Sequence, residues 1–242
     1  MKQNSNRALL TSALSIGLSL LASQAFASTI TLTFGNEANQ ALIENYFNGG
    51  TDSQGKSGPN DGIAFSANAE SLKAGFSGTG GQGTGKFENL PSGAPGILLF
   101  ATPGTGVTNA MNDVAGFQSL SFDYSILTNS ASFAGGTVSL FSGLNGTGSL
   151  LGTVTLSAAG TTVPCTGNLV NGVSKDEFCS WQNTSVTASG GIAESAVFGG
   201  KAALDTEFDS VALTAPVPVP AALLLMISGV GGLAGFARRR RA

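Results

Sequence analysis

Residues 120–126, LSFDYSI, alternate one apolar side chain with one polar side chain. Side chains of an extended strand point in turn to opposite faces, so this period of two predicts a strand buried on one face. Ile30, Leu32 and Phe34 alternate with threonines in the same way, and Val211 and Leu213 repeat the pattern near the C-terminus. Strands buried on one face are typical of antiparallel sheets.

Residues 143–148, GLNGTG, separate two further segments of this kind, 137–142 and 149–157. Their Asn-Gly pair suits a turn with positive φ, so the whole segment predicts a β-hairpin. More strands are expected over 62–67, 72–76, 96–101, 178–187 and 195–199. In residues 37–46 the apolar side chains fall near one helical face, which predicts a short helix after the first strand.

Segment 28–215 contains 30 of the 35 glycines, which disfavour helices and favour turns. It is long enough for one domain with a sizeable core. About ten antiparallel strands predict two packed sheets, because one wide sheet would leave a face and two edges exposed. We therefore expect an all-β, antiparallel β-sandwich, with a jelly roll as the first choice. Its polar loop, residues 48–62, is expected to be either disordered or held by packing or an ion.

Composition excludes several functions. The 242 residues include no histidine, so Ser/His/Asp and Cys/His catalysis and imidazole–metal sites are excluded. Segment 28–215 has all fourteen Asp and Glu residues, five lysines and no arginine, which leaves a net charge of −9. Such a segment repels nucleic acid, because phosphates are bound by lysine and arginine.

The N-terminus has the pattern of a secretory signal peptide. Lys2 and Arg7 precede an uncharged, mostly apolar run over 8–22, and Ala25 and Ala27 are the small residues of a cleavage site. We expect residues 1–27 to engage the secretion translocon and signal peptidase to cut between Ala27 and Ser28. A short amphipathic or transmembrane helix is the alternative.

The C-terminal region, residues 216–242, has three parts. A proline motif, Val217-Pro218-Val219-Pro220-Ala221, is followed by an uncharged stretch over 221–237 and by Arg238, Arg239, Arg240 and Arg241. Seventeen helical residues span about 26 Å, near the lower limit for crossing a bilayer. The arginines would stay in the cytoplasm and place the body outside. A plain tail anchor is the alternative interpretation.

This tripartite tail resembles the VPxPA-type variant of the PEP-CTERM sorting signal, although position 219 is Val where Leu is common. The resemblance implies recognition by an exosortase, an integral membrane cysteine protease or transpeptidase, in Gram-negative bacteria that make extracellular polysaccharide. The body is similar to the extracellular bodies that commonly carry such tails, in stretches such as 45–50, 60–65 and 208–213. Those bodies look like the jelly rolls of carbohydrate-binding modules.

Cys165 and Cys179 lie fourteen positions apart in a chain expected to be exported, so we expect a disulfide between them. A loop of that length would contribute about 3 kcal/mol in the chain-entropy model. A pair of free thiols is the alternative.

Oxygen ligands are the only metal ligands available in quantity, which selects calcium or magnesium over zinc. The first and last strands of a jelly roll tend to be neighbours, so Glu37 and Asp209 could meet around one structural calcium ion. The resemblance to carbohydrate-binding modules implies such an ion. The alternative is that these acids are ordinary solvated turn residues.

Tyr46 and Trp181 are the candidates for stacking against a sugar, although each is expected to be partly buried. We expect an exported, exosortase-processed protein that is anchored in the inner membrane during sorting and then reaches the cell surface or matrix. Its expected role is structural or adhesive, is linked to extracellular polysaccharide, and involves no catalysis. A carbohydrate-binding module is the alternative, and a polysaccharide hydrolase is the third choice.

Overall fold

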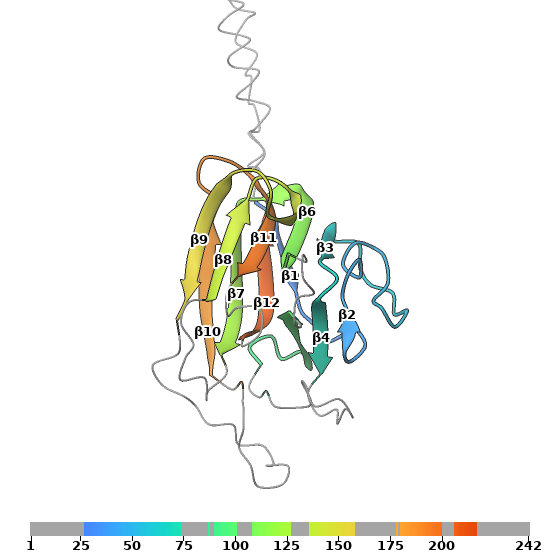
Figure 1. The fold of residues 1–242 in the computed structure, drawn as a ribbon. Coiled ribbons are helices and arrows are strands. Elements are labelled where there is room, and N and C mark those ends of the chain that lie inside the picture. The colour runs from blue at the N-terminus through green and yellow to red at the C-terminus, as the bar shows by residue number, and fades with distance from the viewer. Residues whose placement is uncertain are drawn as a thin grey trace, which may run out of the picture. The chain divides into compact units, whose positions relative to one another are not determined.

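Figure 1 shows the fold in a computed structural model, which describes residues 27–73, 87, 90–100, 108–126, 136–157, 178, 180–199 and 206–216. Residues 27–216 form one compact unit with its own hydrophobic core. A unit of this kind can fold independently. The predicted signal peptide up to Phe26, both cysteines and the tail from Val217 lie outside the described residues.

The described residues form strands and one short 3-10 turn, η1 (Leu144–Gly146). Over these residues, no helix is both long and apolar enough to span a bilayer. The strands, in chain order, are β1 (Thr29–Leu32), β2 (Ala41–Leu42), β3 (Ile63–Phe65), β4 (Ala69–Lys73), β5 (Gly96–Phe100), β6 (Ala110–Phe117), β7 (Ser119–Ile126), β8 (Gly136–Phe141), β9 (Leu150–Leu156), β10 (Trp181–Thr187), β11 (Ala193–Gly199) and β12 (Thr206–Thr214).

These strands make two antiparallel sheets, as the sequence predicts for a β-sandwich. The larger sheet has the order β10-β7-β12-β5-β4-β2, with β1 also paired to β12. The smaller sheet has the order β3-β6-β11-β8-β9. The first and last strands are neighbours as expected, because Ile30 pairs with Leu213 and the Ala215 N–H donates to the Ser28 carbonyl at 2.8 Å.

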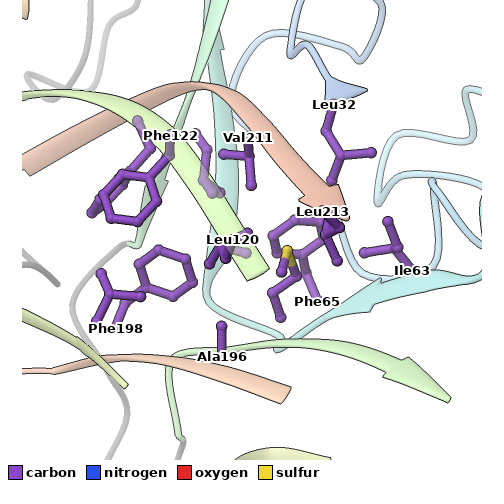
Figure 2. Packing of buried hydrophobic residues seen from close by; sticks show 14 of the residues in the cluster. Leu32, Ile63, Phe65, Leu120, Phe122, Ala196, Phe198, Val211 and Leu213 are labelled. Carbon is purple, nitrogen blue, oxygen red and sulfur yellow. The ribbon is translucent and has the colours of Figure 1, made fainter. Parts of the chain in front are cut away.

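The core lies between the inner faces of the two sheets. Figure 2 shows Leu120, Phe122, Val211 and Leu213 of the larger sheet with Ala196 and Phe198 of the smaller sheet. The Phe198 ring centroid lies 4.6 Å from that of Phe100 and 4.9 Å from that of Phe208. Period-two alternation along β7, and on either side of the irregularity between Asp209 and Ala212 in β12, supplies these inward side chains and sends the intervening polar ones to the outer face.

The predicted hairpin is present between β8 and β9. Asn145 has a φ of 54° and Gly146 a φ of 74°, the left-handed conformation for which this pair is suited. The turn folds back over the outer face of the smaller sheet. Asn145 and Asn112 exchange two hydrogen bonds, of 2.7 and 2.9 Å, and the Gly146 N–H donates to Ser195 Oγ at 3.0 Å.

One expectation about secondary structure is wrong, and one long strand was not expected. The predicted helix over 37–46 is absent, because Ala41 and Leu42 pair with β4 and the left-handed residues Gln40 and Glu44 interrupt any helical path. Strand β6 is not predicted at all. Its sequence, AMNDVAGF, lacks regular alternation, and the register between β6 and β11 shifts between Ala193 and Ser195.

The edge strands of the two sheets, β9 and β10, meet along one side of the sandwich (Figure 1). The Ser189 N–H donates to the Leu151 carbonyl at 2.9 Å, and Gln182 Nε2 donates to the Ser157 carbonyl at 3.2 Å. A Cβ placed on Gly152 would lie 2.6 Å from the Thr187 carbonyl oxygen. Glycine at position 152 therefore permits the close approach of the two strands, which covers part of both edges.

Candidate functional site

Glu37 lies in the turn between β1 and β2, where its side chain is fully buried. Neither carboxylate oxygen has a hydrogen-bond partner of acceptable geometry. Burial raises the pKa of Glu37 from 4.5 to about 7, although the backbone N–H groups of Glu37 and Asn36 and the ammonium groups of Lys73 and Lys56 oppose the shift. With a pKa of about 7, this carboxyl group is protonated below neutral pH and becomes an anionic ligand as the pH rises above that value.

Asp52 organises the polar loop against the Glu37 turn. Its Oδ1 accepts from the N–H groups of Gln54 at 3.0 Å and Lys56 at 2.9 Å, and its Oδ2 accepts from the Ala38 N–H at 2.8 Å. Burial alone would raise the pKa of Asp52, but these three bonds and the Lys56 charge lower it overall. The loop over 48–62 is therefore ordered by its own hydrogen bonds and by one bond to the Glu37 turn, whereas an ion in this loop stays a prediction.

Tyr46 lies beside this cluster and is 4% exposed. Its ring packs edge-on against Phe47, with the ring centroids 5.0 Å apart. Burial raises the pKa of the Tyr46 phenol, and the nearby carboxylates of Glu37 and Asp52 raise it further. The structure thus brings Glu37 and Tyr46 together, although the sequence placed them in different sites, and the buried ring presents no face for stacking a sugar.

Asp209 occupies a different environment on β12, where it is also fully buried. Its Oδ2 accepts from the Ser92 N–H at 2.9 Å and its Oδ1 accepts from the Ser210 N–H at 2.8 Å. The net shift of the Asp209 pKa is upward, mainly because of burial and with a smaller contribution from the cross-strand neighbour Asp123. The hydrogen bonds from Ser92 and Ser210 oppose this shift.

Calcium at Glu37 and Asp209 stays a prediction. The charged groups that act on Glu37 are Lys73 and Lys56, whereas Asp209 is influenced by Asp123. Glu37 alone offers two uncommitted carboxylate oxygens, since both oxygens of Asp209 accept backbone hydrogen bonds. Within the described part of the chain, no three Asp, Glu, Cys or His residues form a group suited to a metal ion.

The outer face of the larger sheet carries the second cluster of polar groups. Tyr124 and Phe208 point into the core, so Ser125 and Glu207 beside them point outward. Glu207 is 2% exposed, its Oε2 has no partner, and burial raises its pKa well above the usual value. Ser125 is fully buried and its Oγ also has no partner. Two unsatisfied polar groups thus face each other across β7 and β12.

Trp181 continues this row on β10, opposite Ser125. The indole is partly buried against a small second apolar cluster that contains Leu72, Phe87, Ile97 and Leu99. In the next row, Asn183 Nδ2 donates to Asp123 Oδ1 at 3.0 Å, and Asp123 lies opposite Asp209. The structure therefore places Trp181 and Asp209 on one sheet face, in adjacent rows.

Glu207, Ser125, Asp123 and Asn183 were not selected from the sequence as site residues. The available signal was the alternation in Glu207-Phe208-Asp209, in which a core phenylalanine separates two carboxylates on the opposite face. The pairing of β12 with β7 and of β7 with β10 adds the other groups.

Several predicted site residues lie outside the described residues. These are Ala25, Cys165 and Cys179, together with the sorting motif 217–221 and the arginines 238–241. Ala27 and Ser28 are described and directly precede β1, which is compatible with a mature chain that begins at Ser28.

Comparisons with known proteins add little. No protein-family model matches the chain, and no curated protein matches it. Among solved structures, the chain is similar to the K1 cleaved adhesin domain of Lys-gingipain from Porphyromonas gingivalis W83, with 16% sequence identity and a TM-score of 0.34. That match covers 78% of this chain and 99% of the gingipain domain. A TM-score this low carries no argument about function.

Proposed function

We propose that the chain is an exported surface or matrix protein with a structural or adhesive role linked to extracellular polysaccharide. In this proposal the signal peptide directs export, the span over 221–237 and the arginines hold the chain in the inner membrane, and an exosortase processes the tail at the proline motif. A disulfide between Cys165 and Cys179 belongs to the same proposal, because it requires an oxidising compartment. We further infer that the sandwich is a jelly roll, in keeping with the pairing of β1 and β12.

The observation that carries this proposal is the position of β12, the strand that leads into the tail. β12 pairs with β7 along most of its length, with β5 at its start and with β1 at its end. A strand with neighbours on both sides cannot leave the sheet without breaking two hydrogen-bond ladders. A body held through its C-terminus in this way transmits load to the centre of the larger sheet, which suits a structural or adhesive protein.

Mass spectrometry of the mature C-terminus tests the sorting step. The protein should end at or near the 217–221 motif in cells with the sorting protease and retain residues up to Ala242 in cells without it. An intact tail in both strains would contradict exosortase processing. Full-length protein found soluble in the cytosol, with both ends intact, would contradict the whole proposal.

The outer-face carboxylates bear on the polysaccharide hydrolase, which is the third choice after the carbohydrate-binding module. Burial raises the pKa of Glu207 well above its usual value, the direction that suits a general acid, and Asp209 is two residues along on the same face. It ranks below the two non-catalytic roles because Glu207 is only 2% exposed. Turnover of the polymer by the wild-type protein, abolished by Glu207→Gln, would promote this candidate to first place.

A further inference from the structure

The outer face of the smaller sheet carries a regular array of uncharged groups on β8 and β9. Thr137 pairs with Thr155, Ser139 with Thr153, and Phe141 with Leu150. Val138 and Leu140 of β8 lie in the core, so these six side chains point away from it. We call this set of six residues the hydroxyl face.

The hydroxyl face is accessible. Thr153 and Thr155 are exposed, and Thr137, Ser139 and Phe141 are partly exposed. Leu150 is 59% exposed and lies opposite Phe141 on the neighbouring strand. Ser139 Oγ and Thr153 Oγ1 lie 3.0 Å apart and share one hydrogen bond, so each hydroxyl keeps further capacity for an outside partner.

Charge decides the class of partner. From Tyr124 to Ser174 the chain has no Asp, Glu, Lys or Arg, and this interval contains both β8 and β9. The body as a whole has a net charge of −9 over residues 28–215. An anionic polymer would be repelled by that charge, and a cationic one would find no counter-charge on β8 or β9. An uncharged partner rich in hydroxyl groups fits both conditions.

The hydroxyl face is also rigid, which lowers the entropic cost of binding. The turn that joins β8 to β9 is fixed to β6 through the Asn145–Asn112 pair and to β11 through Ser195. Ser195 Oγ in turn donates to the Gly143 carbonyl at 2.6 Å. The hairpin is therefore held at its tip as well as by the sheet.

We propose that the hydroxyl face binds a neutral polysaccharide chain, with the hydroxyls of β8 and β9 bonded to sugar hydroxyls and with Phe141 and Leu150 against the apolar face of a sugar ring. This inference rests on the proposed function and adds the contact surface and the class of polymer. Trp181, the remaining candidate for stacking on the other sheet, has no part in it.

The test uses the full-length protein in detergent and the extracellular polysaccharide of the cells that make it, separated by anion exchange into neutral and acidic fractions. Thr153→Val with Thr155→Val removes two hydroxyls while keeping side-chain shape and strand propensity. Ser185→Ala with Thr187→Val is the matched control at exposed positions of β10, on the other sheet. Circular dichroism and thermal unfolding verify that each variant is folded.

The wild type should bind the neutral fraction, and the hydroxyl-face variant should bind it about tenfold more weakly, as expected for two lost hydrogen bonds. The control should bind as the wild type does. Equal binding by wild type and hydroxyl-face variant, or tighter binding to the acidic fraction, would overturn this inference and leave the proposed function standing. Failure to bind either fraction would instead count against the proposed link to polysaccharide, and the inference would fall with it.

Sedimentation equilibrium of the same proteins tests the other possible occupant, a second copy of the chain. A wild-type dimer that becomes a monomer in the Thr153/Thr155 variant would assign the hydroxyl face to self-association and overturn the glycan inference. If the wild type and the variant have the same oligomeric state, the result agrees with the glycan inference.

Discussion

Replacing Glu37 by glutamine should stabilise the body at neutral pH and leave its stability nearly unchanged in acid. The folded pKa of Glu37 is about 7 against an ordinary value of 4.5, because burial disfavours the charged carboxylate. Below pH 4.5 the group is protonated in both the folded and unfolded states and contributes no difference. Between pH 4.5 and 7 the folded state retains a proton that the unfolded state loses, so stability falls as the pH rises.

The shift corresponds to about 3 kcal/mol of unfolding free energy above pH 7. Glutamine is neutral at every pH and has nearly the shape of the protonated acid. Glu37→Gln should therefore exceed the wild type by up to about 3 kcal/mol at pH 8 and match it at pH 4. Glu70, Glu207 and Asp209 also have pKa values raised by burial, but they act equally in both proteins and cancel in the difference.

Urea unfolding of residues 27–216 at several pH values, with chelator present, measures this difference. Glu44→Gln removes one negative charge from the next connection, just after β2, and serves as the control. Two outcomes would refute the claim that burial raises the pKa of Glu37. One is a Glu37→Gln variant that is less stable than the wild type at pH 8, and the other is a stability difference that does not change with pH.

Repeating the series with calcium examines the predicted ion. Bound calcium would raise the melting temperature of the wild type and leave Glu37→Gln unaffected, since the ion requires the carboxylate. If neither chelator nor added calcium moves the wild-type melting temperature, the calcium prediction is rejected.

Three further predictions concern close approach, loop order and the cysteines. Gly152→Ala should destabilise the body by about 1–3 kcal/mol in urea unfolding, because the added carbon would lie 2.6 Å from the Thr187 carbonyl oxygen of β10. The control, Gly191→Ala, should cost less, because its added carbon meets only side-chain atoms at 3.3 Å or more. Asp52→Asn should lose about 2 kcal/mol at pH 7 and progressively less as the pH falls, because the pKa of Asp52 is lowered in the fold and the stabilisation is lost as the acid is protonated. A loss that does not change with pH would contradict this. Non-reducing peptide mapping of exported protein should find Cys165 joined to Cys179, and two alkylatable thiols would reject the disulfide.

Much of the fold could be predicted because the signals are local. Alternation along 120–126 and 211–213 identifies β7 and β12, and the Asn145–Gly146 pair identifies the hairpin turn. β6 and β2 escaped prediction for the same reason. A bulge hides the period of β6, and β2 is two residues long and exists only because β4 lies beside it.

The candidate sites were less predictable, because the sequence shows which residues are acidic but does not show which of them accept hydrogen bonds in the fold. Asp52 and Glu37 are both acids of polar turns in the sequence, yet one accepts three backbone hydrogen bonds and the other none of acceptable geometry. Asp209 is bonded to Ser92, 117 positions away along the chain. No pattern of spacing reveals such a contact.

The sequence by itself determined the strand type of most segments, the acidic charge of the body and the charge-free stretch from Tyr124 to Ser174, because these depend only on the order of side chains. Tertiary structure decided which polar groups are buried without partners and which uncharged side chains face solvent together. Burial and hydrogen bonding depend on neighbours from distant segments, and those neighbours exist only after the two sheets have packed.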